Sequence, residues 1–390
     1  MASVVLLAGM EAGAGGKAAF ADHLDAHPPE VSAKAAALID VESGRILYSK
    51  NGDTPMLIAS LTKIMTAIVA IENGNLADMV KVSRRAYGKE GSSLYLRLGE
   101  EMTLENMLYG LMLRSGNDAA VAIAEHIGGT EEGFVFLMNR KAEELGLHNT
   151  QFRNPHGLDA DGHYSTANDL ARLTAYALKN PVFREIVRTE TKTAPNPNEP
   201  WDYRWRNKNK MLHLYEGADG VKTGYTKAAG RSLVSSATRD GQQLAAVTIN
   251  APNDWADHAR LLDYGFRHFP LRTVLEKGEA VRDTGWVVSG AFRYPLSGEE
   301  RERLEVRLSP LDPDSVDYRL GVRGKLSILL EGRAIGVVDM VEPDSPRLKW
   351  STAAFHPTEH AARPPFSSRL AAAFRQVVRA MFGGDGAWST

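Results

Sequence analysis

The pattern of apolar and polar positions predicts a block of helices with strands on either side of it. Short apolar runs bounded by turn residues predict strands at 35–40, 45–49, 232–237 and 243–250. Apolar residues at helical spacing predict helices at 104–113, 118–127, 131–145, 167–178 and 254–269. This order indicates an α/β fold, although periodicity alone does not fix its topology.

Residues at the expected element ends support these boundaries. Thr103 and Thr166 stand where side-chain N-caps are expected, and Asp169 follows Thr166 by three positions. Gly146 follows one predicted helix as a typical terminator. Asp240-Gly241 separates the last two predicted strands and indicates a tight hairpin.

The chain changes character near Pro270. Apolar and polar residues alternate at 304–308 and over much of 325–338, with a tight turn predicted at 331–333. No helical stretch is expected between these strands, and no catalytic cluster is found there. We therefore predict a larger domain at 28–269, followed by a small all-β domain at 270–350.

The first residues have the character of an export signal. An apolar run at 4–10 precedes Ala19-Phe20-Ala21, a small-x-small cleavage pattern. Residues 1–21 are predicted to be a signal peptide whose first residues are missing from the recorded start, the alternative being a Gly/Ala-rich tail. No segment reaches the roughly 18 to 20 apolar residues that a membrane-spanning helix needs.

The last residues predict an amphipathic helix. After Pro364-Pro365, bulky apolar residues recur at helical spacing, while Arg369, Arg375 and Arg379 fall largely on the other side. The apolar positions are Phe366, Leu370, Phe374, Val377, Val378 and Met381. We predict a membrane-anchor helix at 364–383; the alternative is a helix packed on its own protein.

The amino-acid composition limits the kinds of partner and the kinds of site that the chain can have. The 390 residues leave room for two domains, and a net charge of −2 gives no bulk attraction to nucleic acid. The absence of cysteine excludes disulfides and thiolate metal sites. The aromatic and basic stretch 201–210 is interpreted as a strand beside the active-site sheet rather than a base-stacking surface.

Three short motifs carry the candidate chemistry: Ser60-Leu61-Thr62-Lys63, Ser115-Gly116-Asn117 and Lys222-Thr223-Gly224. On a helix, Ser60 and Lys63 share a face, so a neutral amine there could take the proton of the hydroxyl. The apolar run 64–71 follows Lys63 and predicts a buried helix, in which desolvation lowers the pKa of the lysine. This is the serine–lysine pattern of penicillin-binding proteins and class A β-lactamases.

The surrounding sequence resembles the D-alanyl-D-alanine carboxypeptidases, which are low-molecular-weight penicillin-binding proteins of serine peptidase family S11. The resemblance spans residues 30–345 and is nearest to Gram-positive members, of the branch that trims spore cortex peptidoglycan. It is carried by the stretches 91–96 (Gly-Ser-Ser-Leu-Tyr-Leu), 108–120, 154–158 (Asn-Pro-His-Gly-Leu) and 217–226. It implies the serine β-lactamase-like fold, a mixed sheet with a helical block.

The resemblance also implies roles for individual residues in removing the last D-alanine of a peptidoglycan pentapeptide stem. Ser60 would be the nucleophile and Lys63 its base. Ser115 would pass the proton to the departing amine, and Asn117 would orient Lys63. The backbone N–H groups of Ser60 and Tyr225 would form the oxyanion hole.

The third motif would recognise the substrate. Lys222 and Thr223 would bind the terminal carboxylate, which β-lactam antibiotics also present, and Gly224 would keep the strand edge open. This chemistry needs no metal or cofactor. His156, Asp159, Asp161 and His163 could suggest a metal site, but a loop of turn-forming residues is the preferred interpretation.

Two other functions are weighed against this one. A class A β-lactamase would have Ser-Asp-Asn as its second motif and a Glu-x-x-Leu-Asn segment to activate water, whereas this chain has Ser115-Gly116-Asn117 and no such segment. Penicillin should therefore acylate Ser60 and leave slowly. The other alternative, a catalytically inactive cell-wall binding module, is disfavoured by the intact Ser60 and Lys63. The expected location is extracytoplasmic and membrane-associated.

Overall fold

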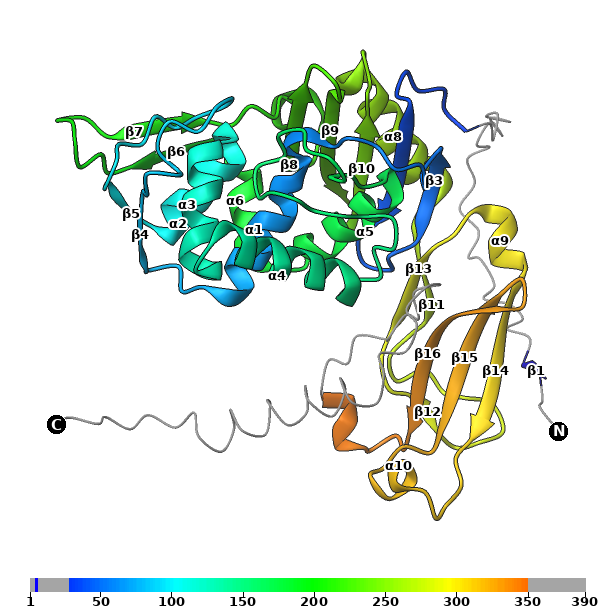
Figure 1. Cartoon of the computed structure of the whole chain (residues 1–390). Coiled ribbons are helices and arrows are strands. Elements are labelled where there is room, and N and C mark those ends of the chain that lie inside the picture. Colours follow the sequence, from blue (N-terminus) through cyan, green and yellow to red (C-terminus); the bar gives the residue numbers. More distant parts are fainter. Residues whose placement is uncertain (1–3, 6–27, 350–390) are drawn as a thin grey trace, which may run out of the picture.

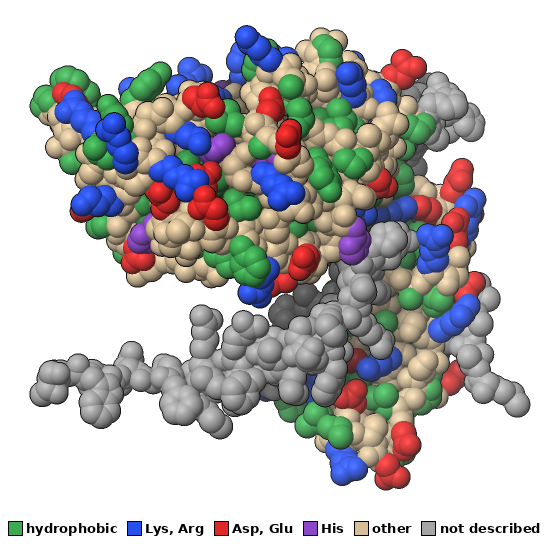
Figure 2. Space-filling model, viewed as in Figure 1, with side chains coloured by type: hydrophobic (Ala, Val, Ile, Leu, Met, Phe, Trp, Pro, Cys, Tyr) green, Lys and Arg blue, Asp and Glu red, His purple; other side chains and the backbone are tan. Residues whose placement is uncertain are grey.

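The computed structural model describes residues 4–5 and 28–349. The predicted anchor helix at 364–383 lies outside the described residues, as does the predicted signal peptide apart from Val4–Val5. Figure 1 shows a larger α/β part formed by residues 28–269 and a smaller β-rich part below it, and Figure 2 shows the same view with the side chains. No helix among the described residues has the length and apolar character needed to cross a membrane.

A five-stranded sheet in the order β3-β2-β10-β9-β8 forms the centre of the α/β part. The strands are β2 (Ala35–Asp40), β3 (Ile46–Lys50), β8 (Ala218–Thr226), β9 (Gly230–Arg239) and β10 (Gln242–Ile249). The predicted α/β fold is confirmed, but every pairing in this sheet is antiparallel rather than mixed. Strand β8 ends the order, so one of its edges is left without a strand partner in the described sheet.

Both faces of the sheet are covered by helices (Figure 1). Along β2, Ala35, Ala37 and Ile39 belong to the core shared with the helical block, whereas Ala36 and Leu38 belong to the core shared with α8 (Asp254–His268). This is the period-two alternation of a strand buried on both faces. The block contains α1 (Lys63–Asn73), α2 (Leu104–Tyr109), α3 (Asn117–Gly128), α4 (Glu131–Glu144), α5 (Ala167–Leu178) and α6 (Pro181–Arg188); a short α7 (Met211–Leu214) precedes β8.

The predicted caps are confirmed. Thr166 Oγ1 accepts from the backbone N–H of Asp169 at 3.1 Å, and α5 has the predicted bounds. Thr103 Oγ1 accepts from Asn106 N at 3.3 Å. The helix predicted at 104–113 ends differently, because α2 passes at Gly110–Arg114 into a π-helical turn, η2.

Two small hairpins extend the α/β part. Strands β4 (Met79–Lys81) and β5 (Glu101–Thr103) form one, and β6 (Thr191–Ala194) and β7 (Tyr203–Arg206) form the other. The strand predicted within 201–210 is confirmed as β7, but its expected place beside the active-site sheet is wrong, since β7 pairs with β6. Which strands pair is decided by tertiary contacts, and the alternation of apolar and polar residues within one strand does not reveal it.

The smaller part is built on a sheet in the order β1-β14-β15-β16-β12, with a separate two-stranded antiparallel sheet of β11 and β13. The expectation of no helix here is wrong, because short helices α9 (Gly298–Glu302) and α10 (Val316–Arg319) interrupt the strands. The strands are β1 (Val4–Val5), β11 (Leu271–Leu275), β12 (Val287–Val288), β13 (Phe292–Pro295), β14 (Leu304–Pro310), β15 (Gly324–Leu330) and β16 (Arg333–Val341), followed by a 3-10 turn, η3 (Pro346–Lys349).

Polar contacts join the two parts. The guanidinium of Arg45 binds the carboxylate of Glu300 and donates to the carbonyl of Pro295 at 2.6 Å. Arg293 pairs with Glu42 at 2.7 Å. None of these residues belongs to the three motifs.

Candidate active site

The first motif lies at the junction of a 3-10 turn, η1 (Ala59–Thr62), and α1, which begins at Lys63. Ala59 has φ of 47°, an uncommon value for a residue with a side chain. Thr62 Oγ1 donates to the carbonyl of Ala59 at 2.9 Å and closes the turn. The tight turn directs Ser60, which remains partly exposed, towards the amine of Lys63.

The amine of Lys63 is at the centre of the site. Its side chain is fully buried, and Nζ lies 3.2 Å from Ser60 Oγ, 2.7 Å from Asn117 Oδ1 and 2.5 Å from the carbonyl oxygen of His156. Burial holds the pKa of Lys63 well below its ordinary value, and the positive charges of Lys222 and Lys208 lower it further. The amine is therefore suited to accept a proton from the neighbouring hydroxyl.

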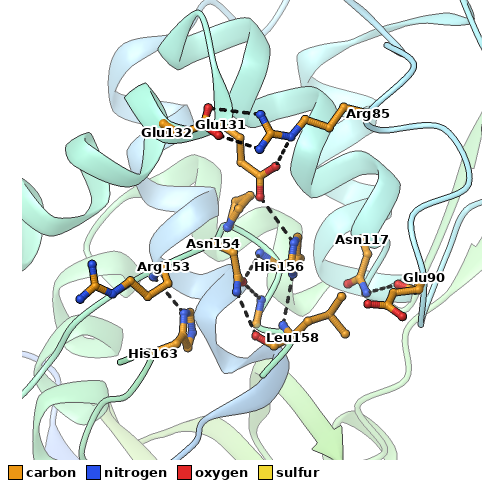
Figure 3. A network of polar contacts seen from close by, with 12 residues as sticks. Arg85, Glu90, Asn117, Glu131, Glu132, Arg153, Asn154, His156, Leu158 and His163 are labelled. Atoms are coloured by element: carbon orange, nitrogen blue, oxygen red, sulfur yellow. Dashed lines mark hydrogen bonds and ion pairs between the residues drawn. The ribbon is translucent and has the colours of Figure 1, made fainter. Parts of the chain in front are cut away.

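The second motif follows the π-helical turn. Ser115 has φ of 65°, and its buried Oγ has no hydrogen-bond partner within the described chain. Asn117 begins α3, and its Nδ2 donates to the carbonyl of Glu90 at 2.6 Å (Figure 3). No described protein group therefore occupies the hydroxyl of Ser115 with a hydrogen bond.

Asp118 fixes the loop that faces these residues. Its buried carboxylate accepts from Ser93 Oγ at 2.7 Å and from the backbone N–H of Leu94 at 2.9 Å. The N–H of Asn117 donates to the carbonyl of Ser92 at 2.7 Å. These bonds attach the loop 91–96 to the start of α3, where an anion is favourably placed.

The third motif lies on the edge strand β8. Lys222 is fully buried, and burial, together with the charge of Lys208, lowers its pKa to about 7. A Cβ atom at Gly224 would lie 3.3 Å from both the carbonyl of Ile58 and the N–H of Ser60, so glycine lets β8 approach the nucleophile. The side chain of the next residue, Tyr225, is 65% exposed.

Two participants were not expected from the sequence. Lys208 follows β7, and its Nζ donates to Ser92 Oγ at 3.2 Å. The carbonyl of His156 is the second acceptor of Lys63. No local pattern marks either role, because one depends on how a hairpin packs and the other uses a backbone atom.

The histidines and acids between 156 and 163 contact different partners. Asp159 accepts from Thr226 Oγ1 at 3.0 Å, and His163 Nε2 lies 2.8 Å from Thr62 Oγ1. Burial lowers the pKa of His163 to about 4. In the part of the chain that the structure describes, no group of three or more His, Cys, Asp or Glu side chains is placed to hold a metal ion.

The chain is similar in sequence and in fold to known proteins. Residues 22–253 match the family model described as D-alanyl-D-alanine carboxypeptidase, Peptidase S11. The chain is 39% identical over 259 residues to D-alanyl-D-alanine carboxypeptidase DacF of Bacillus subtilis, covering 64% of this chain and 66% of that protein. It is 35% identical over 337 residues to DacC of Escherichia coli, covering 82% and 83%. The crystal structure of penicillin binding protein 5 from Haemophilus influenzae aligns with a TM-score of 0.67 and 28% identity over 81% of this chain and 97% of that one.

Proposed function

Since the chain belongs to the D-alanyl-D-alanine carboxypeptidase family, peptidase family S11, we propose that Ser60 is the nucleophile with which it removes the terminal D-alanine from pentapeptide stems of peptidoglycan. The chain is a serine-type carboxypeptidase by this membership. The observation that carries the assignment is the 3.2 Å contact between Ser60 Oγ and the buried amine of Lys63.

Lys63 acts as the general base in its neutral form. A neutral amine has two hydrogens and one lone pair, and the oxygens of Asn117 and His156 accept the two hydrogens. The lone pair is then left for the hydroxyl of Ser60. The serine oxygen attacks the carbonyl carbon of the penultimate D-alanine, and its proton passes to Lys63.

The tetrahedral intermediate needs a stabilised oxyanion and a protonated leaving group. The N–H groups of Ser60 and Tyr225 are proposed to donate to the oxyanion, and one such donor is typically worth about 3 kcal/mol. Ser115 is proposed to relay the proton from Lys63 to the departing amine as the C–N bond breaks. Its buried, unpartnered Oγ supports this role.

Lys222 and Thr223 are proposed to bind the carboxylate of the terminal D-alanine. Lys222 is buried, and among the described residues no carboxylate contributes to its pKa shift. Such a cation favours an anionic ligand, since the pair compensates for the desolvation of the ammonium group. A β-lactam carries its carboxylate at the equivalent place, so we expect it to acylate Ser60 as well. Without a Glu-x-x-Leu-Asn segment to activate water, that acyl-enzyme should hydrolyse slowly.

We propose that the enzyme works outside the cytoplasm, on the pentapeptide stems of assembled peptidoglycan. A role in cell-wall maturation, including spore cortex, is part of the proposal and is suggested by the motif-bearing stretches of the sequence. Export through residues 1–21 and attachment to the membrane through 364–383 are part of the proposal. For both segments, the support for this assignment is the sequence pattern alone.

Substitution of the nucleophile tests the proposal. The Ser60→Ala protein should fold, release no D-alanine from a soluble pentapeptide and take up no labelled penicillin, because no other group replaces the attacking oxygen. D-alanine release and penicillin labelling are measured beside a thermal melt that checks folding. Labelling that persists in the variant would remove Ser60 as the nucleophile, and rapid penicillin turnover by the unaltered protein would favour the β-lactamase alternative.

A further inference from the structure

A second polar chain leads from Lys63 away from the strand β8, and its members lie outside the three motifs. It begins at the carbonyl of His156, which accepts from Lys63 Nζ. The ring of the same residue is only 4% exposed, and its Nε2 lies 3.6 Å from Oε1 of Glu131, a residue in the first turn of α4 with a side chain 9% exposed. Figure 3 shows the ring between Glu131 and Leu158.

The contacts of the ring define which nitrogen carries its proton. The backbone N–H of Leu158 donates to Nδ1 of His156 at 3.2 Å, so Nδ1 is unprotonated and the hydrogen is on Nε2. That hydrogen faces Glu131 across 3.6 Å, which is beyond hydrogen-bonding distance, and Nε2 has no hydrogen-bond partner within the described residues. Burial lowers the pKa of His156, which keeps the ring neutral at neutral pH.

Glu131 is fixed from its other side. Arg85 Nε lies 2.9 Å from Glu131 Oε2, while Arg85 Nη2 binds the neighbouring Glu132 at 2.6 Å. Contact with His156 holds the pKa of Glu131 below its ordinary value. The carboxylate is therefore ionised, and its negative charge attracts the buried ring N–H.

Several hydrogen bonds hold the turn that carries the His156 carbonyl. Asn154 Oδ1 accepts from the N–H of Gly157 at 2.7 Å, and Thr66 Oγ1 donates to the carbonyl of Pro155 at 2.6 Å. The ring of His156 is a further point of attachment, and Glu131 is the carboxylate that faces its Nε2 side. We propose that Glu131 is a positioning residue for Lys63, acting through the His156 ring to hold the His156 carbonyl against the amine.

This inference rests on the proposed function, because it takes Lys63 to be the base. Without Glu131 the buried ring N–H would lose the carboxylate that faces it, and we expect the ring and the turn that bears it to reorient towards another acceptor or water. The carbonyl would then leave Lys63, one amine hydrogen would lose its acceptor, and the lone pair would no longer be directed at Ser60.

The loss would have a distinctive pH signature. A carbonyl stabilises an ammonium group more than a neutral amine, so its removal lowers the pKa of Lys63. The other charges that act on Lys63 are those of Lys222, Lys208 and Asp118, and none of them is altered. Those that act on His156 besides Glu131 are Lys89 and Lys63. In the profile of acylation rate against pH, loss of Glu131 should therefore move the acid limb to lower pH and lower the plateau.

The test compares Glu131→Ala with Glu132→Ala in the full chain. Glu132 is the matched control, because it also binds Arg85 but is 70% exposed and has no contact with His156. Penicillin acylation rates are measured by stopped flow across pH. We expect the Glu131→Ala plateau to fall about 10- to 100-fold, as for a catalytic group displaced by about 1 Å, with the acid limb at lower pH. Glu132→Ala should keep the original profile.

Two further variants keep the test decisive. Glu131→Gln restores an acceptor for the ring N–H and should recover most of the rate, and Glu131→Met fills the space without an acceptor if the alanine variant fails to fold. An unchanged profile in Glu131→Ala or Glu131→Met would overturn the inference, as would a lower plateau whose acid limb does not move. If the unaltered protein showed no acylation that depends on Ser60, the proposed function itself would fail, which is a separate result.

Discussion

At the scale of single residues, the site depends on lysines whose charge is controlled by burial and by one another. Lys208 lowers the pKa of both Lys63 and Lys222. The reaction needs Lys63 neutral and Lys222 charged. As pH increases, kcat/KM should therefore rise when Lys63 loses its proton and fall when Lys222 loses its proton. Removing the charge in Lys208→Met favours both ammonium forms and should raise both pKa values. We predict that both limbs of the kcat/KM profile for D-alanine release move to higher pH in Lys208→Met. If the limbs stayed in place or moved to lower pH, the electrostatic account would be contradicted.

At the scale of elements, the turn 154–158 is packed against η1 so closely that glycine is required. Gly157 has φ of 83°, and an added Cβ would lie 1.9 Å from the carbonyl of Ala59. Gly157→Ala should lower the free energy of unfolding by about 2–5 kcal/mol, because overpacking and left-handed backbone strain add together. It should also slow acylation of Ser60. Gly99→Ala is the control, since Gly99 has φ of 78° with open space around it, and should lose only about 1–2 kcal/mol. Urea unfolding measures both variants, and equal losses would show that the close contact has no energetic weight.

The elements also show what the sequence could and could not predict. The bounds of α5 followed from its local cap and periodicity, because the Thr166 side chain and the apolar face are both encoded within the helix. The π-helical turn that places Ser115 was not foreseen, since its geometry is set by packing. The partner of β7 and the position of Lys208 were missed for the same reason. The motif residues themselves were recognisable because nucleophile and base lie one helical turn apart in the sequence.

At the scale of the whole molecule, the proposed enzyme is a catalytic part joined to a β-rich part, with attachment to the membrane assigned to 364–383. Deleting 364–390 should move the protein from membrane to soluble fractions without changing D-alanine release from a soluble peptide. The apolar residues can partition into an interface at about 0.8 kcal/mol per buried methylene. Arg369, Arg375 and Arg379 should make binding stronger on anionic than on neutral vesicles, and weaker with salt. If the truncated protein melted at a lower temperature and bound vesicles as the full chain does, the predicted helix would instead belong to the folded core.

The central claim is that Ser60, activated by Lys63, forms a covalent acyl-enzyme. Mass spectrometry of the protein after incubation with penicillin tests it most directly. We predict a single added penicillin mass that maps to the peptide containing Ser60, persists for minutes and is absent from Ser60→Ala. An adduct on another residue, or no adduct on a folded protein, would contradict the account.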